Sequence, residues 1–158
     1  MKINKTNAMR QLDAARIKYE TFAYEVDEND LSGTHIAEQI GLPFECVFKT
    51  IVTKGDKTGY TVFCIPCHKE IDLKRAAAVT GNKRVEPVQV KELLALTGYI
   101  RGGCSPIGMK KKFPTYIDSS VTDFEEITIS AGVRGAQLLL STEELIAFVG
   151  AKLAEFAK

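Results

Sequence analysis

The sequence predicts a single α/β domain in which helices surround a mixed, barrel-like central sheet. Segments with helical periodicity alternate along the chain with segments rich in β-branched and aromatic residues. Residues 55–59, GDKTG, separate two such apolar segments and are typical of a hairpin loop. Because hairpins and short helical crossovers occur together, we expect antiparallel and parallel strand pairs in a sheet that curls toward a barrel.

The length and the uniform composition of the chain indicate one domain over residues 1–158. The sequence contains no internal repeat, low-complexity tract or linker. A chain of this length buries roughly two thirds of the surface that its unfolded state exposes. It therefore needs no disulfide or structural metal to stabilise its core.

Two helices and three strands are predicted before residue 70. Met9 and Leu12 follow helical spacing, and the aromatic and β-branched residues of segment 19–24 then predict a strand. A short helix over residues 34–40 ends at Gly41, because glycine readily adopts the left-handed conformation found at helix C-termini. The two strands of the hairpin are expected at residues 47–54 and 60–66.

Three helices and three strands are predicted beyond residue 70. Asp72 can cap the first of these helices, and Gly98 can end the second. Ser141 and Glu144 have the spacing of a capping box at the start of the last helix, which we expect to direct Leu153 toward the core. The strands are expected near residues 113–118, 126–132 and 136–141.

Charge and hydropathy bear on the partners and the location of the protein. The 21 Lys and Arg residues against 20 Asp and Glu residues give a net charge of +1, which neither predicts nor excludes a nucleic-acid partner. The N-terminal segment has no apolar run of signal-peptide length, and no run of about 18 apolar residues suggests a membrane span. We therefore expect a cytoplasmic protein with no membrane partner, whose four cysteines are free thiols.

The segment CIPCH, which begins at Cys64, matches several cysteine motifs. Cys-x-x-Cys-His is the attachment signal of c-type haem, and its first four residues also match a redox dithiol or half of a zinc site. A redox dithiol lies at the start of a helix, whereas Pro66 ends a predicted strand. Outside this segment, only Cys46, Cys104 and His35 could complete a zinc site. We interpret CIPCH as a chance match and expect no haem, metal or other cofactor.

Residues 98–118, GYIRGGCSPIGMKKKFPTYID, combine a glycine-rich loop with a cluster of lysines. The glycines and the Ser-Pro pair predict an ordered loop whose backbone can approach a ligand closely. Lys110, Lys111 and Lys112 follow, and compact positive charge beside such a loop suits a phosphate-bearing partner. The alternative is that the three lysines only form a solvated surface.

Lys49 lies within the predicted strand VFKTIVTK. Strand alternation places it on one face with Val47 and Ile51, so its charge is framed by apolar neighbours. A lysine in such a place is often a functional cation. Alternatively, its aliphatic stem covers apolar surface while the ammonium group lies in solvent.

Four separated motifs together resemble one known family. They are VFKTIV, IPCHKEIDLKRAA, TGYIRGGCSPIG and ISAGVRG, in this order and spacing. The combination is similar to the YbaK/EbsC family of Cys-tRNA(Pro) deacylases, which are related to the editing domain of bacterial prolyl-tRNA synthetases. The likeness extends from about Asn7 to Leu153. It implies a mixed, barrel-like sheet with surrounding helices, and hydrolysis of the ester that joins a wrong amino acid to the 3′ end of a tRNA.

The resemblance implies roles for the residues at matching positions. Lys49 stands at the position of the essential, catalytic lysine. Leu31 stands where some members have Phe, and many members have Pro-Gly-Asp in place of Pro-Cys-His, so neither cysteine of CIPCH is a family catalytic residue. The substrate-binding residues that the resemblance implies are Tyr24, Leu31, Thr50, Gly102, Gly103, Ser105, Pro106, Gly108, Ser130, Gly132 and Arg134.

The sequence offers no Ser-His-Asp order, no paired carboxylates in a glycine-framed site and no convincing metal set. This fits the reaction that the family implies, in which the thiol of the cysteinyl group attacks its own ester carbonyl, forms a thiolactone and frees the tRNA. Our hypothesis makes Lys49 a cation near the 3′ adenosine and the ester, and makes the backbone N–H groups of residues 102–106 oxyanion donors. Ser130 and Thr50 would orient the substrate, and the family pattern does not require Cys104 as a nucleophile.

Several alternatives stay open at the level of sequence. The chain could be an Ala-tRNA(Pro) deacylase of the same fold, a module that binds aminoacyl-tRNA or a synthetase without hydrolysis, or a redox or metal protein. Cys-tRNA(Cys) is also a candidate substrate. A nearly neutral domain lacks the basic surface needed to recognise a whole tRNA. We therefore expect tRNA as a partner and prolyl-tRNA synthetase, which the family implies, as the protein that helps to select it.

Overall fold

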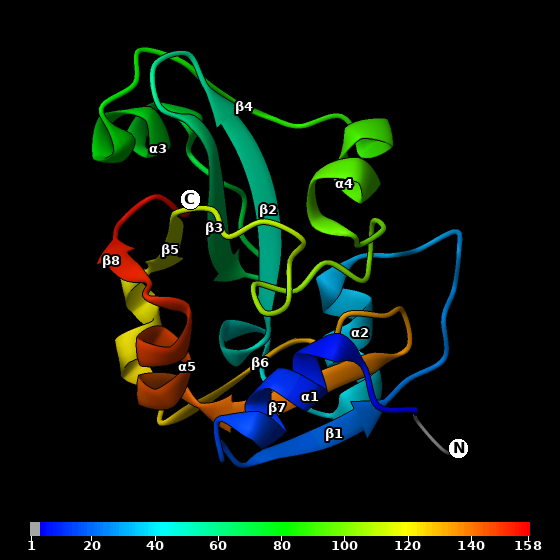
Figure 1. Cartoon of the computed structure of the whole chain (residues 1–158). Helices are drawn as coiled ribbons and strands as arrows, with labels where there is room; N and C mark the ends of the chain where they lie inside the picture. The colour runs from blue at the N-terminus through cyan, green and yellow to red at the C-terminus, as the bar shows by residue number, and fades with distance from the viewer. Residues whose placement is uncertain (1–3) are drawn as a thin grey trace.

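Two β-sheets of unequal size form the centre of the fold (Figure 1). The computed structural model describes residues 4–158, so the first three residues of the predicted domain lie outside the described residues. A three-stranded sheet has the order β1-β7-β6, and a five-stranded sheet has the order β4-β2-β3-β5-β8. The strands are β1 (Tyr19–Ala23), β2 (Phe48–Gly55), β3 (Gly59–Pro66), β4 (Val85–Pro87), β5 (Thr115–Asp118), β6 (Glu126–Ser130), β7 (Ala136–Ser141) and β8 (Lys152–Ala154).

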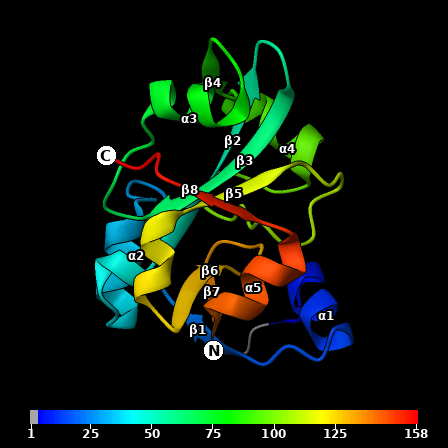
Figure 2. The same cartoon turned by 90° about the vertical axis from the view of Figure 1, so that its left-hand side faces the viewer.

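Helices lie around both sheets. In Figures 1 and 2, α3 and α4 lie on opposite sides of the β2–β3 hairpin, whereas α1 and α5 lie beside the smaller sheet. Within residues 4–158, no helix is long and apolar enough to span a membrane. The helices are α1 (Asn7–Ala14), α2 (Gly33–Ile40), α3 (Leu73–Thr80), α4 (Val90–Thr97) and α5 (Thr142–Val149), with short 3-10 turns η1 (Phe44–Cys46) and η2 (Ser119–Asp123).

The predicted mixed α/β fold is confirmed, but the sheets do not close into a barrel. In the larger sheet, β2 pairs antiparallel with β3 and β4, whereas β5 pairs parallel with β3 and β8. Its edge strands β4 and β8 span only three residues each and do not pair with one another, which leaves that sheet open. A parallel bridge between Val47 and Thr128 joins the larger sheet to the smaller one.

The largest apolar cluster lies where the two sheets meet. It contains Phe48 and Val62 from the larger sheet and Ile129 from the smaller one, all buried. A second cluster contains Phe63, whose ring lies edge-on to that of Phe156 with centroids 4.8 Å apart. Because successive residues of β3 contribute to the two clusters, this strand is buried on both faces, which explains its uninterrupted apolar sequence.

The predicted helix caps are confirmed, except that the last helix ends earlier than expected. Asp72 and Ser141 accept hydrogen bonds from backbone N–H groups of α3 and α5, and Gly98 ends α4 with a φ of 84°. Gly150 ends α5 with a left-handed φ of 66°. The prediction that this helix directs Leu153 into the core is therefore wrong, because Leu153 lies in β8 and is 40% exposed.

Asp118 fastens the C-terminal segment to the end of β5. Its Oδ1 accepts hydrogen bonds from the N–H groups of Phe156 and Ala157, both at 3.1 Å, and its Oδ2 accepts the hydroxyl of Ser120 at 2.6 Å. Burial alone would raise the pKa of Asp118, but the hydrogen bonds outweigh it and lower the pKa below its ordinary value. The charged carboxylate therefore stabilises the folded state.

We predict that Asp118→Asn lowers the free energy of unfolding by about 1–3 kcal/mol at neutral pH, because the amide lacks the charge and presents a donor where an acceptor is needed. The folded pKa lies below the unfolded value, so the contribution is present above about pH 3.9 and is lost as the pH falls through the folded pKa. Urea unfolding at a series of pH values tests this. Wild type and variant should converge in acid, and a difference that is independent of pH would contradict the account.

Candidate functional site

A pocket of about 560 Å³ lies where the two sheets meet. Lys49 and Thr50 come from β2, and Leu31 comes from the segment that leads into α2. Gly102 comes from the loop after α4, and Ser130 is the last residue of β6. These five predicted site residues, which come from four separate segments of the sequence, therefore line one cavity.

Lys49 places a cation in this pocket that forms no close ion pair with a carboxylate among the described residues. Its side chain is half-buried, and this desolvation lowers the pKa of Lys49, although the nearby Cys67 and Glu70 act in the opposite direction. The ion pairs found within 4.0 Å among residues 4–158 do not include Lys49. The positive charge is therefore available to a ligand with a negative or polarisable oxygen.

Ser130 and Thr50 add hydroxyl groups to the same cavity. The Ser130 Oγ accepts a hydrogen bond from the Gly132 N–H at 3.1 Å, which leaves the hydroxyl hydrogen free for donation. The Thr50 Oγ1 lies 3.8 Å from the Sγ of Cys64. Both residues line the Lys49 pocket, where a hydroxyl group can orient a bound ligand.

The thiols near the pocket are protonated at neutral pH. Burial raises the pKa of Cys64 and of Cys104 to about 12 and that of Cys67 to about 11, although the charge of Lys49 opposes the last shift. Cys64 belongs to the large core cluster and Cys67 to a different one beside α2, so the two thiols of CIPCH do not form one site. Within residues 4–158, no three His, Cys, Asp or Glu side chains are arranged to hold a metal ion.

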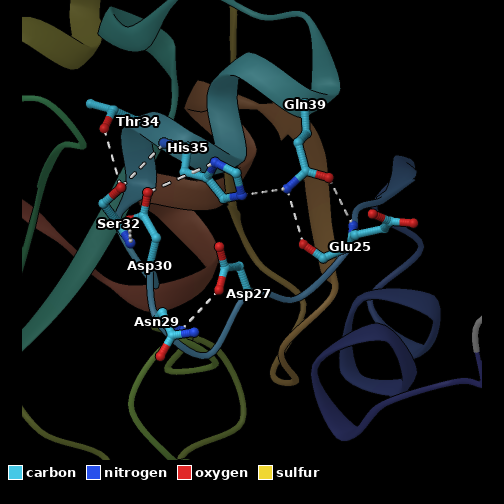
Figure 3. A network of polar contacts seen from close by, with 8 residues as sticks. All are labelled: Glu25, Asp27, Asn29, Asp30, Ser32, Thr34, His35 and Gln39. Atoms are coloured by element: carbon cyan, nitrogen blue, oxygen red, sulfur yellow. Dashed lines mark hydrogen bonds and ion pairs between the residues drawn. The ribbon is translucent and has the colours of Figure 1, made fainter.

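Hydrogen bonds fix the wall formed by the segment before α2 (Figure 3). The carboxamide of Gln39 spans Glu25, accepting from its N–H at 2.9 Å and donating to its carbonyl oxygen at 3.0 Å. His35 lies between Gln39 and Asp30, with ring nitrogens 3.1 Å from the Gln39 Nε2 and 3.9 Å from the Asp30 Oδ2. Ser32 caps α2 through its Oγ. The segment is thereby held against α2 and closes one side of the pocket.

The other seven predicted substrate-binding residues do not line this pocket. The three glycines among them pack against Tyr99 or the turn after β6, and Arg134 donates its Nε–H to the carbonyl oxygen of Arg101 at 2.7 Å. Tyr24 is buried, and its N–H bonds the carbonyl oxygen of Gly135 at 2.9 Å. The seven are Tyr24, Gly103, Ser105, Pro106, Gly108, Gly132 and Arg134.

The glycines among them are needed for close packing. A Cβ added to Gly108 would lie 2.7 Å from the Tyr99 hydroxyl, and one added to Gly132 would lie 3.0 Å from the Tyr99 ring. The Tyr99 hydroxyl donates to the carbonyl oxygen of Ile107, and the Gly103 N–H donates to that of Ile100 at 3.0 Å. The Gly103 N–H is therefore not free to act as an oxyanion donor. Among the predicted donors, the N–H groups of Gly102 and Cys104 stay candidates, because these two residues line the pocket.

The lysine cluster borders a second cavity, of about 370 Å³. Pro106 and Gly108 line it together with Lys110, Lys111 and Lys112, all three of which are exposed. The glycine-rich loop thus faces the Lys49 pocket at its start and the lysine cluster at its end. This arrangement can bind a ligand group at one end and phosphates at the other.

Most residues that line the Lys49 pocket were not among the predicted site residues. They include the polar or charged residues Asp30, Arg101 and Gln137, and Cys67. Gln137 pairs with Ser130 across the β6–β7 ladder, so the strand register could have indicated its position. Cys67 follows the predicted strand end, where its N–H bonds the carbonyl oxygen of Val47 at 2.7 Å.

The chain is similar to proteins of known fold and family. The family profile of the aminoacyl-tRNA editing domain matches residues 32–148. A relative from Enterococcus faecalis (strain ATCC 700802 / V583) is 45% identical over 151 residues, which cover 96% of this chain and 92% of the relative. That relative carries the provisional name Cys-tRNA(Pro)/Cys-tRNA(Cys) deacylase EbsC.

Two solved structures share the fold. A provisionally assigned trans-editing enzyme for prolyl-tRNA synthetase has a TM-score of 0.81 at 23% identity, with coverage of 96% of this chain and 92% of that one. The hypothetical protein APE2540 has a TM-score of 0.87 at 19% identity, with coverage of 97% and 100%. At these identities the two likenesses support the architecture alone.

We predict that Cys67 in the folded protein reacts with iodoacetamide at neutral pH about 100-fold more slowly than in the unfolded protein, because its thiolate fraction is small. Cys64 and Cys104 should react more slowly still. Mass spectrometry of peptides after timed labelling measures the rates, with urea-unfolded protein as the control. Labelling of folded Cys67 at the unfolded rate would show that the pocket holds a reactive thiolate.

Proposed function

Because the chain belongs to the aminoacyl-tRNA editing domain family, we propose that it is an aminoacyl-tRNA deacylase that removes cysteine from mischarged Cys-tRNA(Pro). The family match and the relative confirm the resemblance that the four sequence motifs predicted. The observation that carries the proposal is the half-buried ammonium group of Lys49 in a pocket whose own thiols are protonated. Cys-tRNA(Cys), which also appears in the name of the relative, is a second candidate substrate.

The proposed reaction uses the substrate's thiol as the nucleophile. Its sulfur attacks the ester carbonyl carbon, a C–S bond forms and the C–O bond to the tRNA 3′ oxygen breaks. The proton of the thiol passes to that oxygen, and water then opens the cysteine thiolactone. A pocket that supplies no thiolate of its own suits this route, because its task is to hold the thiol and the carbonyl in attack geometry.

Lys49 is the proposed catalytic residue. Negative charge develops on the carbonyl oxygen during the attack, and a partly desolvated ammonium group stabilises such charge more strongly than one in water. The N–H groups of Gly102 and Cys104 are proposed as additional donors, and the hydroxyls of Ser130 and Thr50 as orienting groups. These roles are supported by the placement of all five residues around one cavity.

The proposed partners are the tRNA and a synthetase. The exposed lysine cluster at residues 110–112 is proposed to contact tRNA phosphates near the 3′ end. Since the net charge is only +1, we propose that prolyl-tRNA synthetase contributes to tRNA selection. We also propose that the reaction takes place in the cytoplasm.

A deacylation assay tests the proposed function. Purified protein is mixed with Cys-tRNA(Pro), Ala-tRNA(Pro), Pro-tRNA(Pro) and Cys-tRNA(Cys), and loss of the acyl group is followed. We expect rapid loss of cysteine, slow loss of alanine because it has no thiol, and retention of proline. Faster loss of alanine would favour an Ala-tRNA(Pro) deacylase, and binding without any loss would favour a non-catalytic module.

We predict that Lys49→Ala lowers turnover of Cys-tRNA(Pro) by about two orders of magnitude or more, as expected for removal of a preorganised charge. Lys49→Arg retains the charge but replaces a compact ammonium group with a wide planar one, so it should be nearly as impaired. The half-buried side chain leaves no large core cavity, and circular dichroism should stay unchanged. Wild-type rates in both variants would show that the stem of Lys49 only covers apolar surface and that its ammonium group has no catalytic role.

We predict that replacing Lys110, Lys111 and Lys112 with Ala weakens tRNA binding and reduces the slope of log K against log salt by up to about 2–3, since each phosphate contact contributes a slope near 0.7–0.9. Saturated turnover should change little, because these contacts act equally on the ground state and the transition state. A variant with Ala at the exposed Lys57, Lys74 and Lys83 removes the same charge elsewhere and should keep the wild-type slope. Equal slopes in all three proteins would show that Lys110, Lys111 and Lys112 only form a solvated surface.

A further inference from the structure

Gln137 contributes a polar side chain to the Lys49 pocket that has no assigned role. It lies in β7 directly opposite Ser130 of β6, is 4% exposed and forms part of the pocket wall. Its Oε1 is buried and accepts no hydrogen bond from any group in residues 4–158. A buried amide oxygen without a donor lowers the stability of the folded state, so its presence in a cavity wall points to a ligand that supplies the donor.

Gln137 differs in its location from the other residues that have a buried polar atom without a hydrogen-bond partner. Among the described residues these are the hydroxyls of Thr128 and Thr142, and neither residue lines the Lys49 pocket. No side-chain or backbone hydrogen bond fixes the Nε2 of Gln137 within residues 4–158 either. Rotation of the terminal amide can therefore turn its oxygen into the cavity without breaking a bond.

The chemistry of the pocket indicates which ligand group the amide receives. An aminoacyl ester carries a carbonyl, which the cation of Lys49 attracts, and an α-ammonium group, which that cation repels. The ammonium group needs an acceptor. The carboxylate of Asp30 lies at an exposed position, where its Oδ1 accepts the Ser32 N–H at 3.1 Å and its Oδ2 faces the His35 ring at 3.9 Å. The Oγ of Ser130 accepts the Gly132 N–H. The buried side-chain acceptor that is left in the wall is the carbonyl of Gln137.

We infer that Gln137 is a substrate-positioning residue whose amide oxygen binds the α-ammonium group of the aminoacyl ester. The inference rests on the proposed deacylase function and deepens it. With the ammonium group at Gln137 and the carbonyl at Lys49, the aminoacyl group has two fixed points, and its side chain is left to turn toward the carbonyl carbon. Recognition at Gln137 is independent of the amino-acid side chain.

The test compares Cys-tRNA(Pro) with 3-mercaptopropionyl-tRNA(Pro), which keeps the ester and the thiol but lacks the α-amino group. For each protein, the ratio of kcat/KM for the two substrates is divided by the ratio of their uncatalysed rates, which removes their difference in intrinsic reactivity. We expect wild type to favour Cys-tRNA(Pro) by about 10- to 100-fold on this measure, as expected for a hydrogen bond to a charged group. Gln137→Leu should abolish the preference.

Two further variants separate this role from a structural one. Gln137→Glu keeps an oxygen acceptor at the same distance from the backbone, so this variant should retain the preference for Cys-tRNA(Pro). If the Gln137 amide acted instead as a hydrogen-bond donor, Gln137→Glu would lose that preference. Thr128→Val removes another buried hydroxyl of the smaller sheet, outside the pocket, and should leave the preference at the wild-type value. Circular dichroism establishes the fold of each variant.

The outcomes are distinguishable. If wild type hydrolyses neither substrate, the proposed function is wrong. If wild type hydrolyses both without a preference, or if Gln137→Leu lowers both rates equally, the function stands and the role of Gln137 is overturned. If Gln137→Leu does not fold, the wild-type preference together with its retention or loss in Gln137→Glu still decides the matter.

Discussion

The antiparallel pairing of β2 with β3 is the interaction on which the site depends. It runs from Phe48 opposite Pro66 to Gly55 opposite Gly59, and it sets Lys49 opposite Ile65. A slip by one residue would move Phe63 and its neighbours into the wrong apolar clusters, because β3 is buried on both faces. Core packing therefore fixes the position of the cation, although Lys49 itself contributes nothing to the core.

The position of Lys49 has an energetic consequence. A half-buried ammonium group that has no ion-pair partner within 4.0 Å among residues 4–158 loses hydration that no close ion pair replaces, which opposes folding and lowers its pKa. The Oε1 of Gln137, which accepts no hydrogen bond from residues 4–158, also opposes folding, and it belongs to the wall of the same pocket. Functional sites often retain such unfavourable groups, since binding of a complementary ligand recovers their interactions. Here the two groups are complementary to the carbonyl and the ammonium group of an aminoacyl ester.

The sequence predicted the parts of the fold that local rules determine. The GDKTG hairpin, the caps at Asp72 and Ser141 and the glycine at position 98 depend on neighbouring residues, and each is present. The division into two open sheets depends on pairing between distant segments, including the three-residue strands β4 and β8, whose composition carries little signal. Periodicity alone could not separate two open sheets from one curled sheet.

Prediction of the site from the sequence was limited in the same way, because local patterns do not show which distant segments meet. Lys49 and Thr50 were predicted because the strand itself and its motif indicated them, but Gln137 and Arg101 join the pocket only through tertiary packing. Conversely, the glycines at positions 103, 108 and 132 belong to recognisable motifs, yet they act as spacers around Tyr99 and the adjoining turn and do not line the pocket. A motif shows that a position is constrained, and only the structure distinguishes contact with a ligand from support of the wall.

The most direct measurement is the structure of the protein with a non-hydrolysable analogue, 3′-cysteinylamino-3′-deoxyadenosine, in which an amide replaces the ester. The account predicts that the cysteinyl group occupies the pocket of Lys49, with its carbonyl oxygen about 2.7–3.2 Å from the lysine Nζ. Its thiol should face the carbonyl carbon. An analogue bound in the cavity beside Lys110, or bound with its carbonyl turned away from Lys49, would contradict the account.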